Sequence, residues 1–193
     1  MTATLHTKPA RDRAKPQTRK FMQTVQPTGV ERTFGEHEVI VSKTDPKGII
    51  TYVNPLFLRL ADMTEEEAIG APHSVVRHPD MPSAVFHLLW DRLLNKQEIF
   101  AYVVNMAKNG DHYWVLAHVT PSINSAGQIT GLHSNRRKPT EAALAVIKPI
   151  YQKMCEIEVK HGDKKAGMEA AAEFLNQTLT AKGLSYEEFI FSL

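Results

Sequence analysis

The sequence predicts an α+β fold, in which a five-stranded antiparallel sheet carries short helices on one face and a helical extension follows. Short stretches rich in β-branched and aromatic residues, separated by turn residues, predict the strands. Asn109-Gly110 joins the two longest stretches, and both positions tolerate the positive φ that a tight hairpin needs. From about residue 140 onward the apolar residues recur at helical spacing alone.

The first two predicted strands form a hairpin. Residues 39–41 are β-branched, residues 45–48 (Asp-Pro-Lys-Gly) have turn chemistry, and residues 49–53 form the returning strand. Asn54 ends this strand, and capping the short helix that follows is its simplest role. A capping box over residues 64–67 predicts a second short helix.

A longer helix and three strands complete the predicted sheet. We expect the helix over residues 83–96 and the strands over residues 99–108, 111–121 and 128–135. The two long strands are apolar on both faces, whereas a sheet with one wet face alternates with polar residues. One face must therefore cover the helices and any pocket, and the other needs a cover from a terminal helix or a second subunit.

The sequence divides into three regions. Residues 1–34 form a basic, proline-containing segment that we expect to be a mobile tail, residues 35–138 form the α+β domain, and residues 139–193 form the helical extension. Stripes of apolar residues over 147–157 and 168–179 predict a helical hairpin or a dimer-forming arm in the extension.

Composition excludes several functional classes. The formal net charge of +2 argues against nucleic acid as the main partner. No apolar run approaches the roughly 18 residues that span a bilayer, and the amino end lacks the apolar core of a signal peptide. Cys155 is the single cysteine, so no internal disulfide forms and a cytoplasmic location is expected.

The loop between the short helices and the long helix concentrates polar chemistry. Arg77, His78 and Asp80 lie within four positions between prolines, which restrict the free loop. The guanidinium can bind a phosphate or a carbonyl edge, the imidazole can donate to an anion, and the carboxylate can orient either group. The alternative is an Arg–Asp salt bridge that only ties the loop.

Three further residues are candidates for a pocket wall. Asn105 lies in an otherwise apolar strand, where a buried amide must find partners in a ligand, a neighbour or water. Phe86 and Trp90 lie four residues apart on one helix face, as core filler or as a surface for a flat ring. The sequence shows no glycine-rich phosphate loop and no nucleophile–base motif, so an enzyme is not expected. Histidines on or beside the strands leave a haem ligand open.

Two long motifs carry a resemblance to a known family. The stretch from Val76 to Pro82 (VRHPDMP) and the stretch from Lys108 to Val115 (KNGDHYWV), with Phe86, Trp90 and Asn105 between them, closely resemble the flavin-binding PAS domain of bacterial aerotaxis transducers. The resemblance covers about residues 35–140. It implies the PAS fold and non-covalent FAD between the sheet and the helices.

The resemblance also implies site residues and partners. The implied FAD-binding positions are Arg77, His78, Asp80, Asn54, Phe86, Trp90, Asn105 and Phe100, the last standing where the family commonly has Trp. The implied function is that of a cytoplasmic redox or oxygen sensor, a homodimer that signals to a chemoreceptor or a kinase-type output without a membrane span of its own. A haem-binding gas sensor and a cofactor-free dimerisation or adaptor module remain as alternatives on the same fold.

Overall fold

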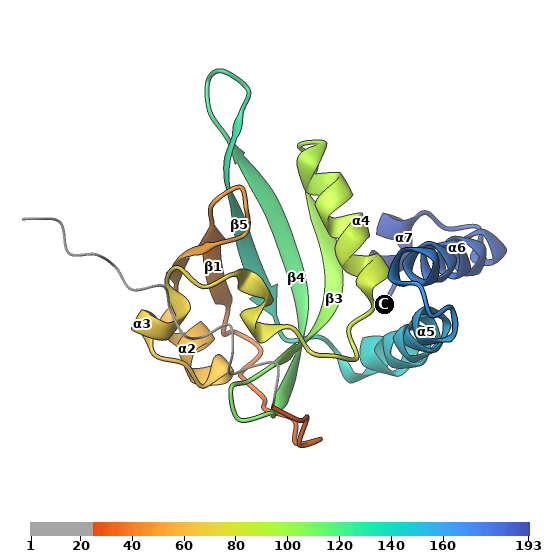
Figure 1. Ribbon diagram of the computed structural model, residues 1–193, viewed down its shortest axis with the longest axis horizontal. Coiled ribbons are helices and arrows are strands. Elements are labelled where there is room, and N and C mark those ends of the chain that lie inside the picture. The colour runs from red at the N-terminus through yellow and green to blue at the C-terminus, as the bar shows by residue number, and fades with distance from the viewer. Residues whose placement is uncertain (1–24) are drawn as a thin grey trace, which may run out of the picture.

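A computed structural model describes residues 25–193, in which an antiparallel sheet carries helices on one face and a helical hairpin at its edge (Figure 1). The strand order is β2-β1-β5-β4-β3. The strands are β1 (Ile40–Thr44), β2 (Ile50–Val53), β3 (Ile99–Met106), β4 (His112–Ile123) and β5 (Ile129–Arg137). The five-stranded antiparallel sheet predicted from the sequence is confirmed.

Short helices cover one face of the sheet, as predicted. They are α2 (Pro55–Ala61), α3 (Glu65–Ala68), the 3₁₀ helix η1 (His73–Val76) and α4 (Ser83–Leu94). The predicted capping box begins α3, where Thr64 accepts from the backbone N–H of Glu67 and the Glu67 carboxylate accepts from that of Thr64. The elements end within a few residues of the predicted bounds.

The register of β3 and β4 decides which side chains face the helices. The two strands pair without a bulge from Ile99 with Val119 to Met106 with His112. Successive side chains in a strand point to opposite faces, so Val103 and Asn105 face α4 whereas Tyr102 and Val104 face away. We call these the inner and the outer face.

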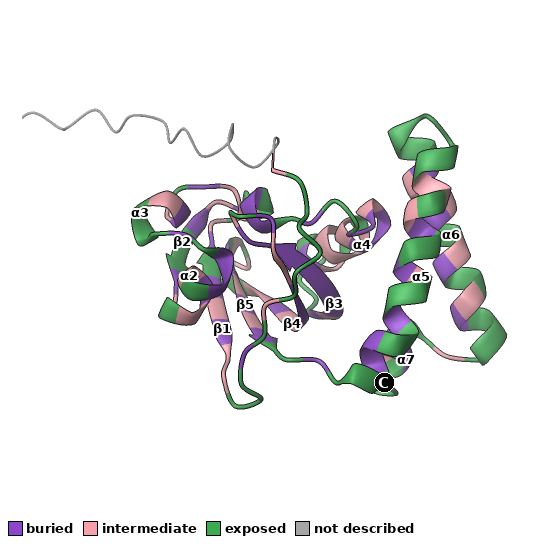
Figure 2. Ribbon diagram, turned by 90° about the horizontal axis from the view of Figure 1, so that it is seen from below, coloured by how far each residue is buried: buried purple, intermediate pink, exposed green. Residues whose placement is uncertain are grey.

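The carboxyl-terminal helices cover part of the outer face and the free edge of β3. They are α5 (Glu141–Lys160), α6 (Lys164–Lys182) and α7 (Tyr186–Phe191). The Tyr151 hydroxyl donates to the backbone oxygen of Tyr102 at 2.8 Å, and the Tyr151 ring packs beside Trp114. Figure 2 shows α5 and α6 side by side as a hairpin. Of the two alternatives expected to cover the apolar outer face, a terminal helix of the same chain is the one that the structure shows.

The segment before β1 is bound to the sheet. Thr28 donates its backbone N–H to Gly110, Arg32 donates to His112, and the Arg32 side chain contacts Asp111 at 2.9 Å. The predicted mobile tail over residues 1–34 is therefore wrong for residues 25–34, because the β3–β4 turn supplies backbone partners that the sequence does not reveal. Residues 1–24 lie outside the described residues. Between residues 25 and 193, none of the helices combines the length and apolar character that crossing a membrane requires.

Candidate functional site

A small cavity lies between the inner face of the sheet and α4. Its volume is about 90 Å³. Val103, Ala117, Val119 and Leu132 form the apolar floor, and Phe86, Leu89 and Trp90 of α4 form the roof. The three roof residues are half-buried, so this side of α4 is only partly packed.

Trp90 closes the cavity against the β1–β2 turn. Gly48 has φ +80°, and a Cβ added there would lie 3.3 Å from the Trp90 ring. The predicted turn therefore needs glycine for two reasons, the left-handed backbone and the close approach of the indole.

A buried guanidinium occupies one end of the cavity. Arg136 is 4% exposed and donates from Nη2 to Ser42 Oγ at 2.8 Å and to His73 Nε2 at 2.5 Å. Because His73 Nε2 accepts from Arg136, its ring proton belongs on Nδ1. Ser42, on β1, and His73, at the start of η1, thus both bind the same nitrogen of Arg136 on β5 and lie 3.1 Å from each other.

The charge of Arg136 has no carboxylate partner among residues 25–193: every ion pair there involves other cations. Burial lowers the pKa of Arg136 to about 10, and burial followed by the Arg136 charge lowers the pKa of His73 to about 3. The pair is therefore Arg⁺ and neutral His at pH 7. A buried cation without a counter-charge is costly unless hydrogen bonds or a ligand compensate it.

Two further polar groups face the same cavity. Ser134 Oγ is buried and has no hydrogen-bond partner within the described part of the chain. Asn105 is 5% exposed and brings an amide, which both donates and accepts, to the apolar floor. Together with Arg136 and His73 they suit a flat ligand that is apolar on its faces and carries carbonyl and ring-nitrogen groups along one edge.

The structure brings three predicted site residues into this cavity: Phe86, Trp90 and Asn105. Arg77 lies behind the wall, where its guanidinium stacks over the Phe86 ring at 4.4 Å and donates to Ser83 Oγ at 3.0 Å. Its backbone pairs with that of Asn105.

His78 and Asp80 point elsewhere. The His78 ring is buried beside His112 and accepts at Nδ1 from the backbone N–H of Asp80, 3.1 Å away. Burial lowers the pKa of His78, and Asp80 opposes that change from 3.8 Å. The Asp80 side chain is 82% exposed. Asp80 thus lies beside His78 within the loop, and the Arg–Asp salt bridge considered as the alternative is not formed.

Asn54 and Phe100 also lie away from the cavity lining. Asn54 Oδ1 accepts from the backbone N–H groups of Val41 and Phe57, and its Nδ2 donates to Val39 at 2.8 Å, which confirms its capping role. Phe100 faces the outer side, where it stacks on His118 at 4.1 Å and meets Phe191. Strand parity turns Phe100 to the outer face, so it does not line the cavity in this structure.

Sequence reasoning missed Arg136, His73 and Ser134. The predicted last strand ended at Asn135, one residue before Arg136. Had that strand been extended, the alternation Leu132, Ser134, Arg136 would have placed a serine and an arginine on the inner face.

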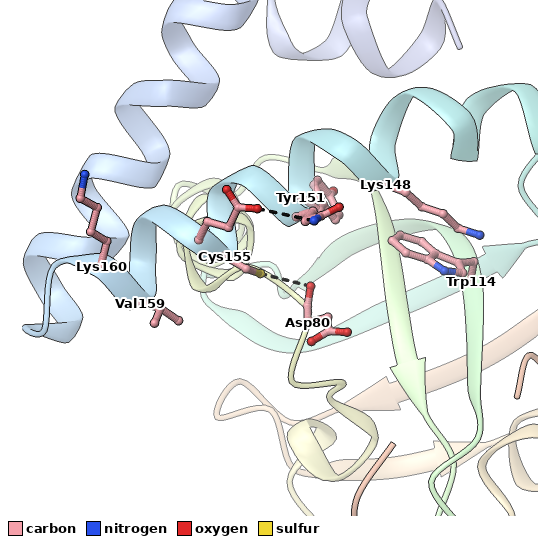
Figure 3. A pocket seen from close by; sticks show the side chains of 9 residues that line it. Asp80, Trp114, Lys148, Tyr151, Cys155, Val159 and Lys160 are labelled. Atoms are coloured by element: carbon pink, nitrogen blue, oxygen red, sulfur yellow. Dashed lines mark hydrogen bonds between the residues drawn. The ribbon is translucent and has the colours of Figure 1, made fainter. Parts of the chain in front are cut away.

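A second, open hollow of about 720 Å³ lies between α5, the start of β4 and the loop after η1 (Figure 3). Trp114 and Tyr151 form its apolar floor, Lys148 lies 5.6 Å from the Trp114 ring centre, and Cys155 donates to the backbone oxygen of Asp80. It lies on the opposite side of β3 from the cavity.

Comparisons with known proteins agree with this fold. The sequence profile that describes the PAS fold matches residues 50–135. The "Aerotaxis receptor" of Escherichia coli (strain K12) is 38% identical over 119 residues, which cover 62% of this chain and 23% of the receptor. The "Nitrogen fixation regulatory protein" of Klebsiella pneumoniae is 28% identical over 119 residues, covering 61% of this chain and 24% of that protein. The matched segment spans about a quarter of these relatives' length.

Solved structures show the same fold at low sequence identity. A light-oxygen-voltage domain described under "Flavin Analogue Sheds Light on Light-Oxygen-Voltage Domain Mechanism" superposes with a TM-score of 0.53 at 16% identity, over 58% of this chain and 85% of that one. The blue-light photoreceptor Aureochrome1 LOV gives 0.52 at 18% identity, over 57% and 88%.

Proposed function

We propose that this chain is a flavin-binding redox sensor that passes its state to a partner protein, because residues 50–135 match the PAS fold and the chain is similar to an aerotaxis receptor. The observation that carries the proposal is the buried Arg136 guanidinium, which faces the cavity without a carboxylate. The similarity to an aerotaxis receptor and to light-oxygen-voltage domains supports the same ligand class.

The polar groups of the cavity suit a flavin ring. Arg136 can donate to a ring carbonyl or nitrogen, Asn105 can donate and accept along the same edge, and the free hydroxyl of Ser134 can complete the set. The sheet residues and the α4 aromatics supply apolar contact for the ring faces. A bound flavin would supply a redox-active ring whose charge and protonation change on reduction. A fixed guanidinium beside the ring would favour the more negative state.

The cavity is too small to admit a flavin ring unless a part of its wall moves. About 90 Å³ is well below the roughly 300–1,000 Å³ that small-molecule pockets usually occupy. The residues of the sheet floor are buried, whereas Phe86, Leu89 and Trp90 of α4 are half-buried. We therefore place the adjustment in α4, which must move outward from the sheet to admit the ring.

The finer parts of the proposal are FAD as the cofactor, a cytoplasmic location, a homodimer and a chemoreceptor or kinase-type partner. FAD is the cofactor that the resemblance to the flavin-binding PAS domain of aerotaxis transducers implies, and the 38% identity to an aerotaxis receptor supports that resemblance. The loop residues Arg77, His78 and Asp80 are proposed to contact the cofactor only after α4 and the loop move, since the present structure turns them away from the cavity.

The experiment is an absorption spectrum of the freshly purified full chain, followed by titration of the apoprotein with FAD and with FMN. A flavin spectrum that bleaches under dithionite, with tighter binding of FAD, is the expected result. A colourless protein that binds neither nucleotide would overturn the flavin assignment, and a Soret band would transfer it to haem.

A further inference from the structure

The amino end of α4 is capped by a residue from α5, 75 positions away in the sequence. Pro82 precedes α4 and supplies no capping side chain. Instead, the Glu158 carboxylate accepts from the backbone N–H of Ser83 at 3.0 Å and from that of Ala84 at 2.9 Å. A carboxylate at a helix amino terminus makes charge-assisted hydrogen bonds and also favours the helix dipole.

The loop before α4 is held by the same turn of α5. Cys155 lies one helical turn before Glu158 and donates from Sγ to the backbone oxygen of Asp80 at 3.3 Å (Figure 3). The loop and the first turn of α4 therefore contact a single short stretch of the carboxyl-terminal extension.

The same turn of α4 leads to the cavity wall. Ser83 Oγ accepts from Arg77, whose guanidinium covers the outer side of the Phe86 ring, and Phe86 itself lines the cavity. Phe86 is one turn of helix away from the N–H groups that Glu158 holds. Any outward movement of α4 that enlarges the cavity must lengthen or break the two bonds to Glu158, unless α5 moves with it.

Glu158 is in turn fixed to α6. Gly167 of α6 packs directly on its backbone, since a Cβ added at Gly167 would lie 2.5 Å from the Glu158 carbonyl oxygen. With no side chain between them, the two helices cannot slide at this point without losing contact. A displacement of Glu158 therefore reaches α6 by direct backbone contact.

We propose that Glu158 couples α4 to the α5–α6 hairpin, so that the hairpin is the element that reports the state of the cavity to a partner. The inference rests on the proposed flavin function, because a change in the flavin is the event that would move α4. The coupling itself depends only on contacts within this chain. The structure shows the carboxylate on the α4 terminus. In the proposed switch, a ligand that moves α4 outward favours a second arrangement in which the carboxylate is released.

Hydrogen–deuterium exchange on the full chain tests the coupling. The variants are Glu158→Ala and the matched control Glu156→Ala, whose exposed carboxylate lies two positions earlier on α5 and contacts Gln152 and Lys153. Without ligand, we expect the amides at the start of α4 to exchange about tenfold faster in Glu158→Ala and at the wild-type rate in Glu156→Ala.

The decisive comparison uses FAD-saturated protein in oxidised and dithionite-reduced form. We expect a redox-dependent difference in α4, α5 and α6 in the wild type and in Glu156→Ala. Because α4 also contacts α6 directly, the difference in α5 and α6 should be smaller, not absent, in Glu158→Ala. An α6 difference in Glu158→Ala as large as that of the wild type would overturn the proposal, as would a wild type in which α4 responds and α6 does not. Glu158→Leu, which fills much of the same space but has no hydrogen-bond acceptor, serves the same purpose if the alanine variant unfolds.

A second stimulus tests the coupling independently of flavin binding. If the protein takes up no flavin, Ala117→Leu replaces it as the stimulus, because the larger side chain pushes α4 from the cavity floor. The coupling then predicts faster exchange in α6 of Ala117→Leu, and a clearly smaller increase when Glu158→Ala is added, since only the direct contact of α4 with α6 remains. An equal increase in both would overturn it.

Discussion

The environment of Arg136 indicates a role in ligand binding. Its guanidinium is buried, bound by a serine and a neutral histidine, and far from any carboxylate in the described chain. Buried cations of this kind usually weaken a protein relative to an apolar residue of similar volume. Its presence therefore favours a role in binding rather than in stability.

Arg136→Met separates these two roles. We expect the free energy of unfolding of the apoprotein to stay within about 1 kcal/mol of the wild type or to rise, because the desolvated charge is gone while Ser42 and His73 keep each other at 3.1 Å. Flavin affinity should fall roughly 10- to 100-fold, as for the loss of hydrogen bonds to a charged group. Urea unfolding and flavin titration measure the two effects. Unchanged affinity would remove Arg136 from the site.

His73 gives the apoprotein a distinct pH dependence. An unfolded histidine titrates near 6.5, whereas burial and then Arg136 lower the pKa of folded His73 to about 3. Between these values the unfolded chain binds a proton that the folded chain excludes, so stability is complete above about pH 6.5 and is lost as the pH falls toward 3. We expect this loss to be on the order of 2–4 kcal/mol.

The measurement is urea unfolding at several pH values for wild type and His73→Gln. The variant should show a shallower decline below pH 6.5, while contributions from carboxylates and from His78 remain common to both. Parallel curves for the two proteins would show that His73 takes up its proton in the folded state.

At the scale of elements, Asn54 joins β1 to α2 by three hydrogen bonds. Asn54→Ala should lower the free energy of unfolding by about 1–3 kcal/mol, because the cap and the backbone partners of β1 are lost together. Asn54→Asp keeps the acceptor for Val41 and Phe57 but sets a carboxylate oxygen against the Val39 carbonyl, so it should retain the cap while still lowering stability. Thermal and urea unfolding measure both.

The same pair of variants decides whether Asn54 also serves the cofactor. The structure predicts that folded Asn54→Asp binds flavin as the wild type does, since the amide lies outside the cavity lining. Weaker binding by this variant would instead support the role that the family resemblance implies.

Local chemistry explains which elements the sequence could predict. Asn109-Gly110, the capping boxes and the apolar faces of the helices are local signals, and they gave the sheet, the helices and the hairpin of the extension. The hydrogen bond between Arg136 and His73 could not be predicted, because it joins β5 to η1 across 63 positions of the sequence. The outward orientation of Phe100 could not be predicted either, because the face on which a strand residue lies is known only once the register of β3 is known.

At the scale of the whole molecule, the carboxyl-terminal helices complete the core of the sheet domain. Tyr102 and Trp114 are buried on the outer face where α5 packs, and α7 packs against β3. The extension therefore belongs to the same cooperative unit as the sheet, although its sequence pattern alone is also compatible with a separate arm.

Ending the chain after Lys138 tests this dependence. The truncated protein should expose Tyr102, Trp114 and the edge of β3, and we expect it to unfold at a lower urea concentration or to associate through the uncovered surface. Size-exclusion chromatography and urea unfolding of both lengths provide the comparison. A truncated monomer as stable as the full chain would show that the helices are an independent appendage.

The closure of the cavity by Trp90 against Gly48 has an optical consequence. The chain has only two tryptophans, and the other, Trp114, lies on the outer face beside Tyr151. An absorbing ligand under α4 would quench the emission of Trp90 by energy transfer more strongly than that of Trp114. Replacing either indole by phenylalanine thus leaves a chain with one native fluorophore, which reports either the approach of the ligand or the seating of α5.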